Sequence, residues 1–284
     1  MERIDFDKMQ GLGNDYVYLT CMDELPADMP ELARRISDRH FGVGGDGMVV
    51  ITRSDVADFR MIMFNADGSE AQMCGNASRC IARLVYEKGL TSKQDITLET
   101  RAGIKRLKLN FENGEIRDVS VNMGLPFLKA EEIPVETEGC TLHNDVIVRN
   151  VEADGHTFEI YCVGMGNPHG VIFMNPEEDF FQKYGPLLEH HPIWPEKANI
   201  EFVKILSPRE IEMRVWERGT GETLACGTGA CASAVACILT GKTDNGATVK
   251  MKGGELEIQL NDKGEVIMKG NAELVASGVY YYNK

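Results

Sequence analysis

The sequence predicts two copies of one folding unit, each combining several strands with a helix that begins at a cysteine. Two stretches carry this prediction, Cys74-Gly75-Asn76-Ala77 and Cys226-Gly227-Thr228-Gly229, whose leading cysteines lie 152 residues apart. Each stretch opens with Cys-Gly and continues into an apolar helical pattern. In a chain of 284 residues, a repeat of this length indicates two domains of ordinary size.

Further matches keep nearly the same offset along the chain. A glutamate lies four residues before each cysteine, and a glycine lies fifteen residues after it, where the helix is expected to end. Gly11-Leu12-Gly13-Asn14 matches Gly164-Met165-Gly166-Asn167 at an offset of 153, and Asn113-Gly114-Glu115 matches Lys263-Gly264-Glu265 at 150. Five matches in the same order indicate an internal duplication.

Strand patterns dominate both copies. In the first copy we predict a strand, a glycine turn and a strand over 4–20, a helix over 30–41, strands at 48–51 and 59–64, a helix over 74–89, and strands at 97–100, 104–111 and 116–123. Residues 124–139 hold two prolines and several glutamates and are interpreted as the crossing between domains. In the second copy we predict strands at 157–163, 171–174, 199–205, 211–216, 248–251, 256–260, 266–269 and 273–282, with helices over 180–190 and from Cys226 to Gly241.

These elements give the expected domain boundaries. Residues 1–125 form the N-terminal domain, which carries Cys74 and is completed by the C-terminal strand 274–284. Residues 126–273 form the second domain, which carries Cys226. The glycine-rich loop 42–47 lacks the Lys-Ser/Thr ending of a phosphate loop and stands between a helix and a strand, so we interpret it as a turn with a close backbone approach.

Composition excludes several classes of protein. Hydrophobic residues make up 43% and charged residues 26%, as in soluble globular proteins. A net charge of −14 argues against nucleic-acid and anionic-membrane partners. No apolar run reaches the ~18 residues of a membrane helix, and the start has no signal pattern, so a cytoplasmic location is expected.

The eight cysteines do not indicate a disulfide framework or a metal site. No CxxC pair and no Cys/His cluster at zinc spacing occurs. We expect six of them to be buried as small hydrophobic residues: Cys21, Cys80, Cys140, Cys162, Cys231 and Cys237.

Cys74 and Cys226 have a chemical interpretation because each begins a helix. The first N–H groups of a helix and its dipole stabilise a thiolate and can also hold a carboxylate. Two such sites related by a pseudo-twofold are expected to face each other and flank one small anionic substrate. An acid on one face of a carbanion and a base on the other is what a racemase or epimerase without a cofactor needs.

Asn14 lies in a glycine-bounded turn, where asparagine is common because it tolerates positive φ. Its counterpart Asn167 in the second copy favours a ligand-binding amide in both places.

Five spaced motifs resemble the diaminopimelate epimerase family over essentially the whole chain. They are Lys-Met-x-Gly-Leu-Gly-Asn-Asp at 8–15, Phe-Asn-Ala-Asp-Gly-Ser-Glu at 64–70, Met-Cys-Gly-Asn at 73–76, Met-Gly-Asn-Pro-His at 165–169, and Glu-Arg-Gly with Ala-Cys-Gly-Thr-Gly within 217–229. The resemblance implies conversion of LL-diaminopimelate to the meso form without pyridoxal phosphate or metal, in lysine and peptidoglycan biosynthesis. It also implies an α+β fold of two pseudosymmetric domains, each a curled, barrel-like mixed sheet around a central helix, and a homodimer.

The resemblance also assigns roles to residues. Cys74 and Cys226 would be the two acid/base thiols, with His169 and Glu217 setting their pKa values. The expected substrate contacts are Asn14, Asn65, Asn167, Asn199, Glu217 and Arg218, and the helix-start N–H groups of Gly75, Asn76, Gly227 and Thr228.

Other functions remain open at this point. A related racemase of another amino acid would use the same cysteines and differ only in pocket residues. A proline racemase-like or isomerase relative of the same fold is a second alternative, although the isomerase branch lacks the cysteines. A non-catalytic binding protein of this fold is a third, which a turnover assay would separate.

Overall fold

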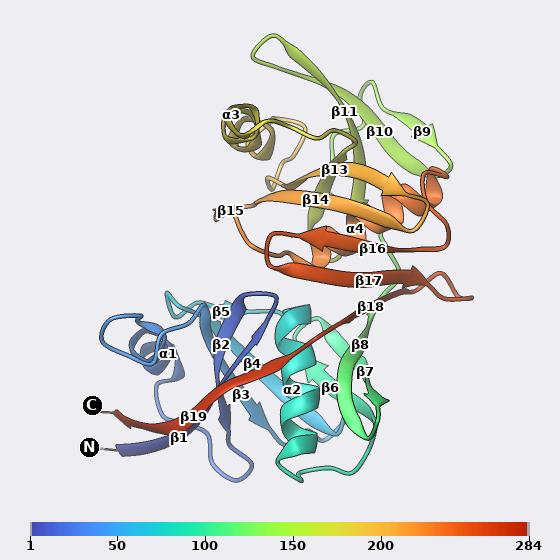
Figure 1. Ribbon diagram of the computed structural model, residues 1–284. Helices are drawn as coiled ribbons and strands as arrows, with labels where there is room; N and C mark the ends of the chain where they lie inside the picture. The colour runs from blue at the N-terminus through green and yellow to red at the C-terminus, as the bar shows by residue number, and fades with distance from the viewer. Residues whose placement is uncertain (1, 283–284) are drawn as a thin grey trace. The chain divides into compact units, whose positions relative to one another are not determined.

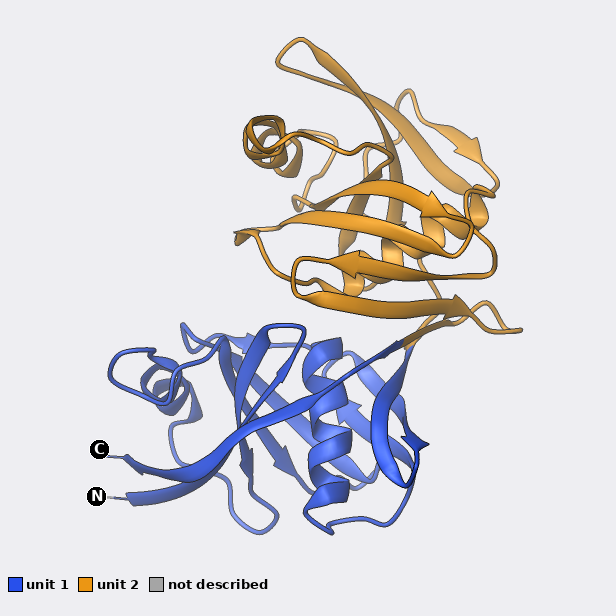
Figure 2. Ribbon diagram, viewed as in Figure 1, with its two compact units in different colours: residues 1–122, 269–284 blue, residues 123–268 orange. Residues whose placement is uncertain are grey.

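The computed structural model describes residues 2–282, in which the chain forms four helices and 19 strands (Figure 1). Its internal contacts divide it into two compact units, residues 1–122 with 269–284 and residues 123–268 (Figure 2). The boundaries expected at 125 and 273 stay a prediction. No helix of residues 2–282 is long and apolar enough to span a membrane.

Unit 1 is a mixed sheet with two helices. Its strands are β1 (Glu2–Gly11), β2 (Asn14–Thr20), β3 (Gly47–Thr52), β4 (Phe59–Asn65), β5 (Glu70–Ala71), β6 (Asp95–Thr100), β7 (Gly103–Glu112), β8 (Glu115–Gly124) and β19 (Glu273–Tyr282). They pair in the order β19-β1-β2-β3-β4-β6-β7-β8, with β5 on β4. The pairs β2–β3 and β4–β6 are parallel, and the others are antiparallel.

Unit 2 has its own mixed sheet. Its strands are β9 (Thr141–His143), β10 (Val146–Ala153), β11 (His156–Gly164), β12 (Pro168–Ile172), β13 (Asn199–Ser207), β14 (Glu210–Glu217), β15 (Gly221–Glu222), β16 (Gly246–Met251) and β17 (Gly254–Leu260), and β18 (Val266–Gly270) follows them in the chain. They pair in the order β9-β10-β11-β12-β13-β14-β16-β17, with β15 on β14. The pairs β12–β13 and β14–β16 are parallel, and the others are antiparallel.

The two sheets repeat one succession of strand directions. Strands β1 to β7 of unit 1 correspond in order to β11 to β17 of unit 2, and β19 takes the place beside β1 that β10 takes beside β11. The last strand of the chain therefore completes the first sheet. The predicted α+β class, with a duplicated unit and a curled mixed sheet, is confirmed.

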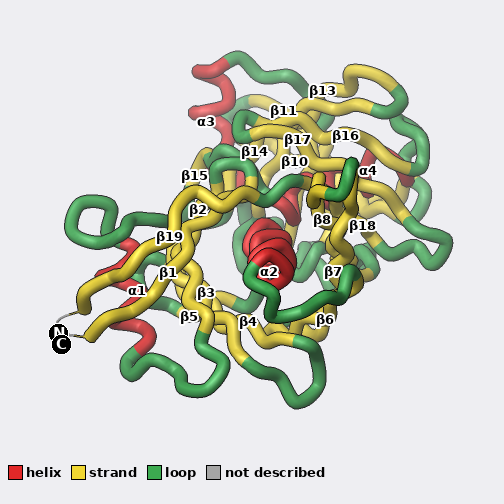
Figure 3. Tube along the Cα trace, turned by 60° about the horizontal axis from the view of Figure 1, so that its bottom comes forward, coloured by secondary structure: helices red, strands yellow, loops and turns green. Residues whose placement is uncertain are grey.

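Helix α2 (Gly75–Glu87) lies at the centre of unit 1. Figure 3 shows it nearly end-on with strands around it. Every residue from Gly75 to Cys80 is buried, and Gly89 (φ 69°) closes the helix where the sequence predicted its end.

Helix α4 (Gly227–Leu239) is the corresponding helix of unit 2 and contacts six of its strands. It contains no charged residue, and all positions from Gly229 to Cys237 are buried. A helix that is apolar on all sides is stable only when it is surrounded by protein, so the sequence itself requires a central position.

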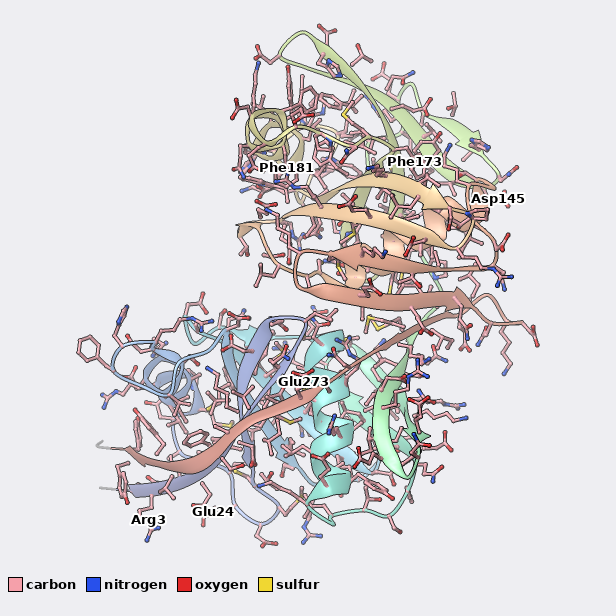
Figure 4. The ribbon with its side chains drawn as sticks, viewed as in Figure 1. Arg3, Glu24, Asp145, Phe173, Phe181 and Glu273 are labelled. Carbon is pink, nitrogen blue, oxygen red and sulfur yellow. The ribbon has the colours of Figure 1, made fainter. Side chains whose placement is uncertain are left out.

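The two remaining helices occupy corresponding places in their units. Helix α1 (Met29–Ser37) follows β2, and helix α3 (Glu178–Glu189) follows β12. Phe181 on α3, labelled in Figure 4, is fully buried and lies under the Arg214 guanidinium, 3.9 Å from Cζ to the ring centroid. Glu273, also labelled, begins β19 and accepts a hydrogen bond from Gln10 Nε2 at 2.7 Å.

Two sequence-based expectations need correction. Strands β9 and β10 are not predicted by the sequence pattern; both follow the proline-containing segment 124–139 that was interpreted as a crossing. Of the six cysteines expected to be buried, Cys80, Cys162, Cys231 and Cys237 are, whereas Cys21 and Cys140 are partly exposed.

Candidate active site

Cys74 and Cys226 hold the same structural position in their units. Each is the N-cap residue of the central helix and has an extended backbone, with φ −136° at Cys74 and φ −121° at Cys226. The Cys226 side chain accepts a hydrogen bond from Gly229 N in the first turn of its helix, whereas the Cys74 side chain makes no such capping bond; both residues lie at the positive end of a helix dipole.

In unit 1 the Cys74 thiol meets the side-chain amide of Asn14. Sγ lies 3.4 Å from Asn14 Oδ1, and Asn76 Nδ2 lies 3.5 Å from the same oxygen. Asn14 Nδ2 donates to Asp46 Oδ2 at 2.8 Å. Because a carboxylate only accepts hydrogen bonds, Asp46 turns the amide nitrogen of Asn14 towards itself and the oxygen towards the thiol.

A network of charged side chains holds the Asp46 carboxylate, which in turn is hydrogen-bonded to the Asn14 amide. Arg39 Nη2 bonds both Asp15 Oδ1 at 2.8 Å and Asp46 Oδ1 at 2.9 Å, and Lys8 Nζ bonds Asp15 Oδ2 at 2.7 Å. Burial raises the pKa of Asp15, but the hydrogen bonds and charges of Arg39 and Lys8 outweigh it and hold this pKa below its usual value. Asp46 lies in the loop 42–47, which was expected to make a close backbone approach. A Cβ on Gly47 would indeed lie 2.1 Å from the Phe64 carbonyl oxygen.

The other unit 1 candidates lie near the start of α2 or in the loop before it. Gly75 and Asn76 are buried in the first turn of the helix. Asn65 ends β4 and is exposed, and its Nδ2 donates to Ser69 Oγ at 3.0 Å. The structure thus brings Cys74, Asn14 and Asn76 into contact and places Asn65 on the surface.

In unit 2 the Cys226 thiol is almost completely buried, with an exposed fraction of 6%. Its Sγ accepts from Gly229 N at 3.4 Å and lies 3.5 Å from Thr228 Oγ1. Burial raises the pKa of the Cys226 thiol well above its usual value, and the negative charges of Glu217 and Glu201 raise it further. The bonds from Thr228 and Gly229 lower this pKa by less. In unit 2 the Cys226 thiol therefore favours its protonated form.

Glu217 interacts directly with Cys226 and accepts a hydrogen bond from Thr223 Oγ1. Burial raises the pKa of Glu217, the Thr223 bond lowers it, and the charge of Glu201 raises it again. The charge of His169 and the contact with Cys226 both act in the lowering direction. The net shift is upward, so Glu217 and Cys226 both hold protons more tightly than usual.

His169 on β12 is fully buried and bonded at both ring nitrogens. Nδ1 lies 2.7 Å from Glu201 Oε1, and Nε2 lies 2.9 Å from Asn167 Oδ1. Glu201, fully buried on β13, was not among the sequence-predicted site residues. Its only sequence signal is a single carboxylate within the apolar stretch Asn199-Ile200-Glu201-Phe202-Val203.

Asn199 and Arg218 lie beside this cluster and bond to each other. Asn199 Oδ1 accepts from Arg218 N at 3.0 Å, and Asn199 Nδ2 donates to the Pro168 carbonyl at 3.1 Å. The Arg218 guanidinium donates to the Glu196 carbonyl at 3.0 Å. Asn199 therefore joins the β12 segment to the loop that carries Arg218, and a role in substrate contact remains a prediction.

Within residues 2–282, no three His, Cys, Asp or Glu side chains are grouped so as to hold a metal ion. Each site presents one thiol: Cys226 Sγ accepts from Gly229 N in the first turn of α4, and Cys74 Sγ meets Asn14 Oδ1 at the start of α2.

The family model for diaminopimelate epimerase matches residues 6–128 and 161–275. This chain belongs to the diaminopimelate epimerase family. Both cysteines and every predicted site residue lie inside the matched ranges. The motifs that first indicated the resemblance are therefore part of the family match.

Relatives in this epimerase family cover nearly the full chain. The diaminopimelate epimerase of Desulfovibrio desulfuricans is 51% identical over 280 residues, covering 97% of this chain and 98% of the relative. Those of Acetivibrio thermocellus and Methanococcus maripaludis are 49% identical over 275 residues, covering 96% of this chain and 97% and 98% of the relatives.

Solved structures of lower identity share the fold. A Bacillus anthracis phenazine biosynthesis protein of the PhzF family is 18% identical with a TM-score of 0.68, covering 99% of this chain and 100% of that one. A hydroxyproline epimerase from Agrobacterium vitis is 13% identical with a TM-score of 0.68, covering 98% and 91%. At these identities the likeness concerns the fold alone.

Proposed function

We propose that this enzyme converts LL-diaminopimelate to meso-diaminopimelate, with one thiol removing the α-proton and the other returning a proton on the opposite face. Cys74 and Cys226 are the two thiols. In one direction one of them is the base and the other the acid, and the roles exchange in the reverse reaction.

The α-proton of an amino acid is very weakly acidic, so the developing negative charge must be met by fixed dipoles in a site without water. The helix-start N–H groups at Gly75, Asn76, Gly227 and Thr228 supply such dipoles for the substrate carboxylate. Asn14, Asn65, Asn167, Asn199, Glu217 and Arg218 are proposed to hold the remaining polar groups of the substrate.

One observation carries this proposal. The same residue type, cysteine, caps the central helix of both repeated units, and it does so in a chain about half identical to relatives named diaminopimelate epimerase. A single cysteine would serve many reactions, but a pair preserved at equivalent positions of a duplication fits a reaction that needs two equivalent proton carriers.

The test is proton exchange in D₂O under reducing conditions with no added cofactor, followed by NMR. We expect the wild-type chain to incorporate deuterium at the α-carbon of LL-diaminopimelate and to form the meso isomer. Because each thiol supplies one proton transfer, Cys74→Ala and Cys226→Ala should each lower epimerisation by roughly 10²- to 10⁴-fold.

Matched controls come from the same two helices. Cys80→Ala on α2 and Cys231→Ala on α4 also remove a buried thiol, but neither residue caps its helix. Both should retain epimerisation. Exchange with another amino acid and none with diaminopimelate would overturn the substrate, whereas exchange that survives in Cys74→Ala or Cys226→Ala would overturn the two-thiol mechanism.

We also propose that the enzyme acts as a cytoplasmic homodimer. The support for association is that β19 carries three exposed apolar side chains, namely Leu274, Val275 and Tyr281, which are 46%, 57% and 55% exposed. Light scattering of the purified chain measures the mass directly, and a monomer at working concentration would refute the dimer.

A further inference from the structure

A buried carboxylate with no assigned role lies beneath the Cys226 site. Glu201 on β13 has no exposed surface, and its Oε1 is bonded to His169. No hydrogen-bond donor among residues 2–282 reaches its Oε2. Burying a carboxylate without full hydrogen bonding costs free energy. A carboxylate that is buried despite this cost is expected to have a function.

The register of two parallel strands creates the contact between Glu201 and His169. Strand β12 pairs with β13 so that His169 is opposite Asn199 and Val171 is opposite Glu201. Because a carboxylate only accepts, the Nδ1 of His169 must carry the proton of the 2.7 Å bond. The other nitrogen, Nε2, lies 2.9 Å from Asn167 Oδ1, an amide oxygen that can only accept a hydrogen bond.

Glu201 also contacts the helix that Cys226 caps. A Cβ added to Gly229 would lie 2.7 Å from Glu201 Oε1 and 3.3 Å from Cys226 Sγ. The carboxylate therefore occupies the space beside the first turn of α4, where the positive end of the helix dipole favours a negative charge. Glycine at this position is explained by the carboxylate, since the equivalent residue of α2 is Ala77.

The duplication supplies an internal comparison. In unit 1 the residues that correspond to His169 and Glu201 are Tyr16 and Val49, by the matching registers of β2–β3 and β12–β13. Both are buried, and Val49 cannot bind a proton. The residue that corresponds to Glu217 is Asn65. The three ionisable side chains near the Cys226 thiol are His169, Glu201 and Glu217. None of them has a counterpart of the same type in unit 1.

We propose that Glu201 is a positioning residue for epimerisation, which fixes the His169 ring through the hydrogen bond to Nδ1. Glu201, His169 and Glu217 then form a group of ionisable side chains near the Cys226 thiol. Within residues 2–282 the Cys74 thiol has no such group. The inference rests on the proposed role of Cys226 as one of the two thiols. The groups around the cluster are Glu217 on β14, Cys226 and Thr228 at the start of α4, Thr223 in the preceding loop and Asn167 before β12.

The first test needs no substrate. In ¹⁵N NMR of the full-length, uniformly labelled chain, His169 should show a protonated Nδ1 with a strongly downfield proton, typical of a bond to a carboxylate. His169→Asn, which lacks the signal, assigns it among the six histidines. A wild-type His169 with an unprotonated Nδ1 would overturn the proposal without any variant of Glu201.

The second test replaces the carboxylate with an amide of the same shape. In Glu201→Gln the downfield His169 signal should be lost, and the pH at which Cys226 ionises should fall because a negative charge has been removed. Since a hydrogen bond to a charged group is worth roughly 10- to 100-fold in an equilibrium, kcat should fall by about that factor with a smaller change in KM.

Two further variants separate positioning from general stability. Glu212→Gln, an exposed carboxylate on the neighbouring strand, should change none of these readouts. Glu201→Asp keeps the charge and should restore the His169 signal in part. A folded Glu201→Gln with unchanged His169 signals and an unchanged Cys226 ionisation would refute the inference. If the wild-type chain has no epimerase activity, the proposed function fails, while the NMR result still decides the Glu201–His169 contact.

Discussion

At the scale of single residues, the two thiols differ in what their sulfur atoms meet. Cys74 Sγ faces an acceptor, Asn14 Oδ1, at 3.4 Å. Cys226 Sγ accepts from Gly229 N, which favours the thiolate, but burial and two carboxylates oppose this and hold its pKa well above the usual value. The pKa of Cys226 is thus raised first by burial and then by its two acidic neighbours.

We predict that Glu217→Gln lowers the pH at which Cys226 ionises. The thiolate is an anion, a nearby negative charge disfavours it and raises its pKa, and removal of that charge reverses the effect. The measurement is the rate of Cys226 alkylation by iodoacetamide across the neutral and alkaline range, read by peptide mass spectrometry. Glu210→Gln at the start of the same strand is the control, because its carboxylate pairs with Lys250 instead. An unchanged alkylation profile in Glu217→Gln would contradict this account.

At the scale of elements, the C-terminal end of α3 is hydrogen-bonded to the segment that carries Glu217 and Arg218. Glu189, 3% exposed, accepts from Trp216 Nε1 at 3.0 Å and from Gly219 N at 2.8 Å. A carboxylate at the negative end of a helix is electrostatically unfavourable, and here the two hydrogen bonds on either side of Glu217-Arg218 offset it. Glu189 therefore fixes the loop from α3.

We predict that Glu189→Gln destabilises this loop. The amide has one acceptor oxygen in place of two, so one partly buried N–H loses its partner, at a cost of about 1 kcal/mol. Denaturant unfolding should show this loss, and KM should rise because Arg218 is held less firmly. Glu178→Gln at the exposed start of α3, where the carboxylate pairs with Arg214 at 3.0 Å, should leave KM unchanged. Equal effects of the two variants would rule out a specific role for Glu189.

At the scale of the whole molecule, the end of the chain stabilises the beginning. Strand β19 pairs antiparallel with β1 from Gln10–Glu273 to Glu2–Tyr282, and Tyr282 belongs to the same buried core cluster as Val17 and Leu32. The α2 side chains of Arg79 and Arg83 donate to the carbonyls of Asn271 and Ala272, just before this strand. Unit 1 therefore depends on residues that follow all of unit 2 in the chain.

We predict that a chain ending at residue 272 loses the stability of unit 1 selectively. Removal of β19 exposes one edge of β1 and forfeits main-chain hydrogen bonds worth about 1 kcal/mol each. Hydrogen exchange should increase in residues 2–122 and stay near the wild-type level in unit 2. A synthetic peptide of residues 273–284 added in trans should restore protection. Equal loss of protection in both units would show that they do not unfold separately.

Sequence reasoning reached the features that depend on local pattern. The helix starts at Cys74 and Cys226, the helix ends at Gly89 and Gly241 with positive φ, and the duplication of the unit were all predictable. It missed Asp46, Glu189 and Glu201, which act through contacts 27 to 32 residues away in the chain. An isolated carboxylate in a loop, at a helix end or in an apolar strand is ordinarily interpreted as solvated, and nothing local distinguishes these three.

The sequence by itself determined the duplication, the helix-capping cysteines and the family, because each of these follows from short motifs and their spacing along the chain. The tertiary structure alone decided that Glu201, and not a water-exposed carboxylate, bonds His169, and that Asp46 orients Asn14. The physical reason is strand register: the parallel pairing of β12 with β13 places His169 near Glu201, and a shift of one residue would turn the Glu201 side chain to the other face of the sheet.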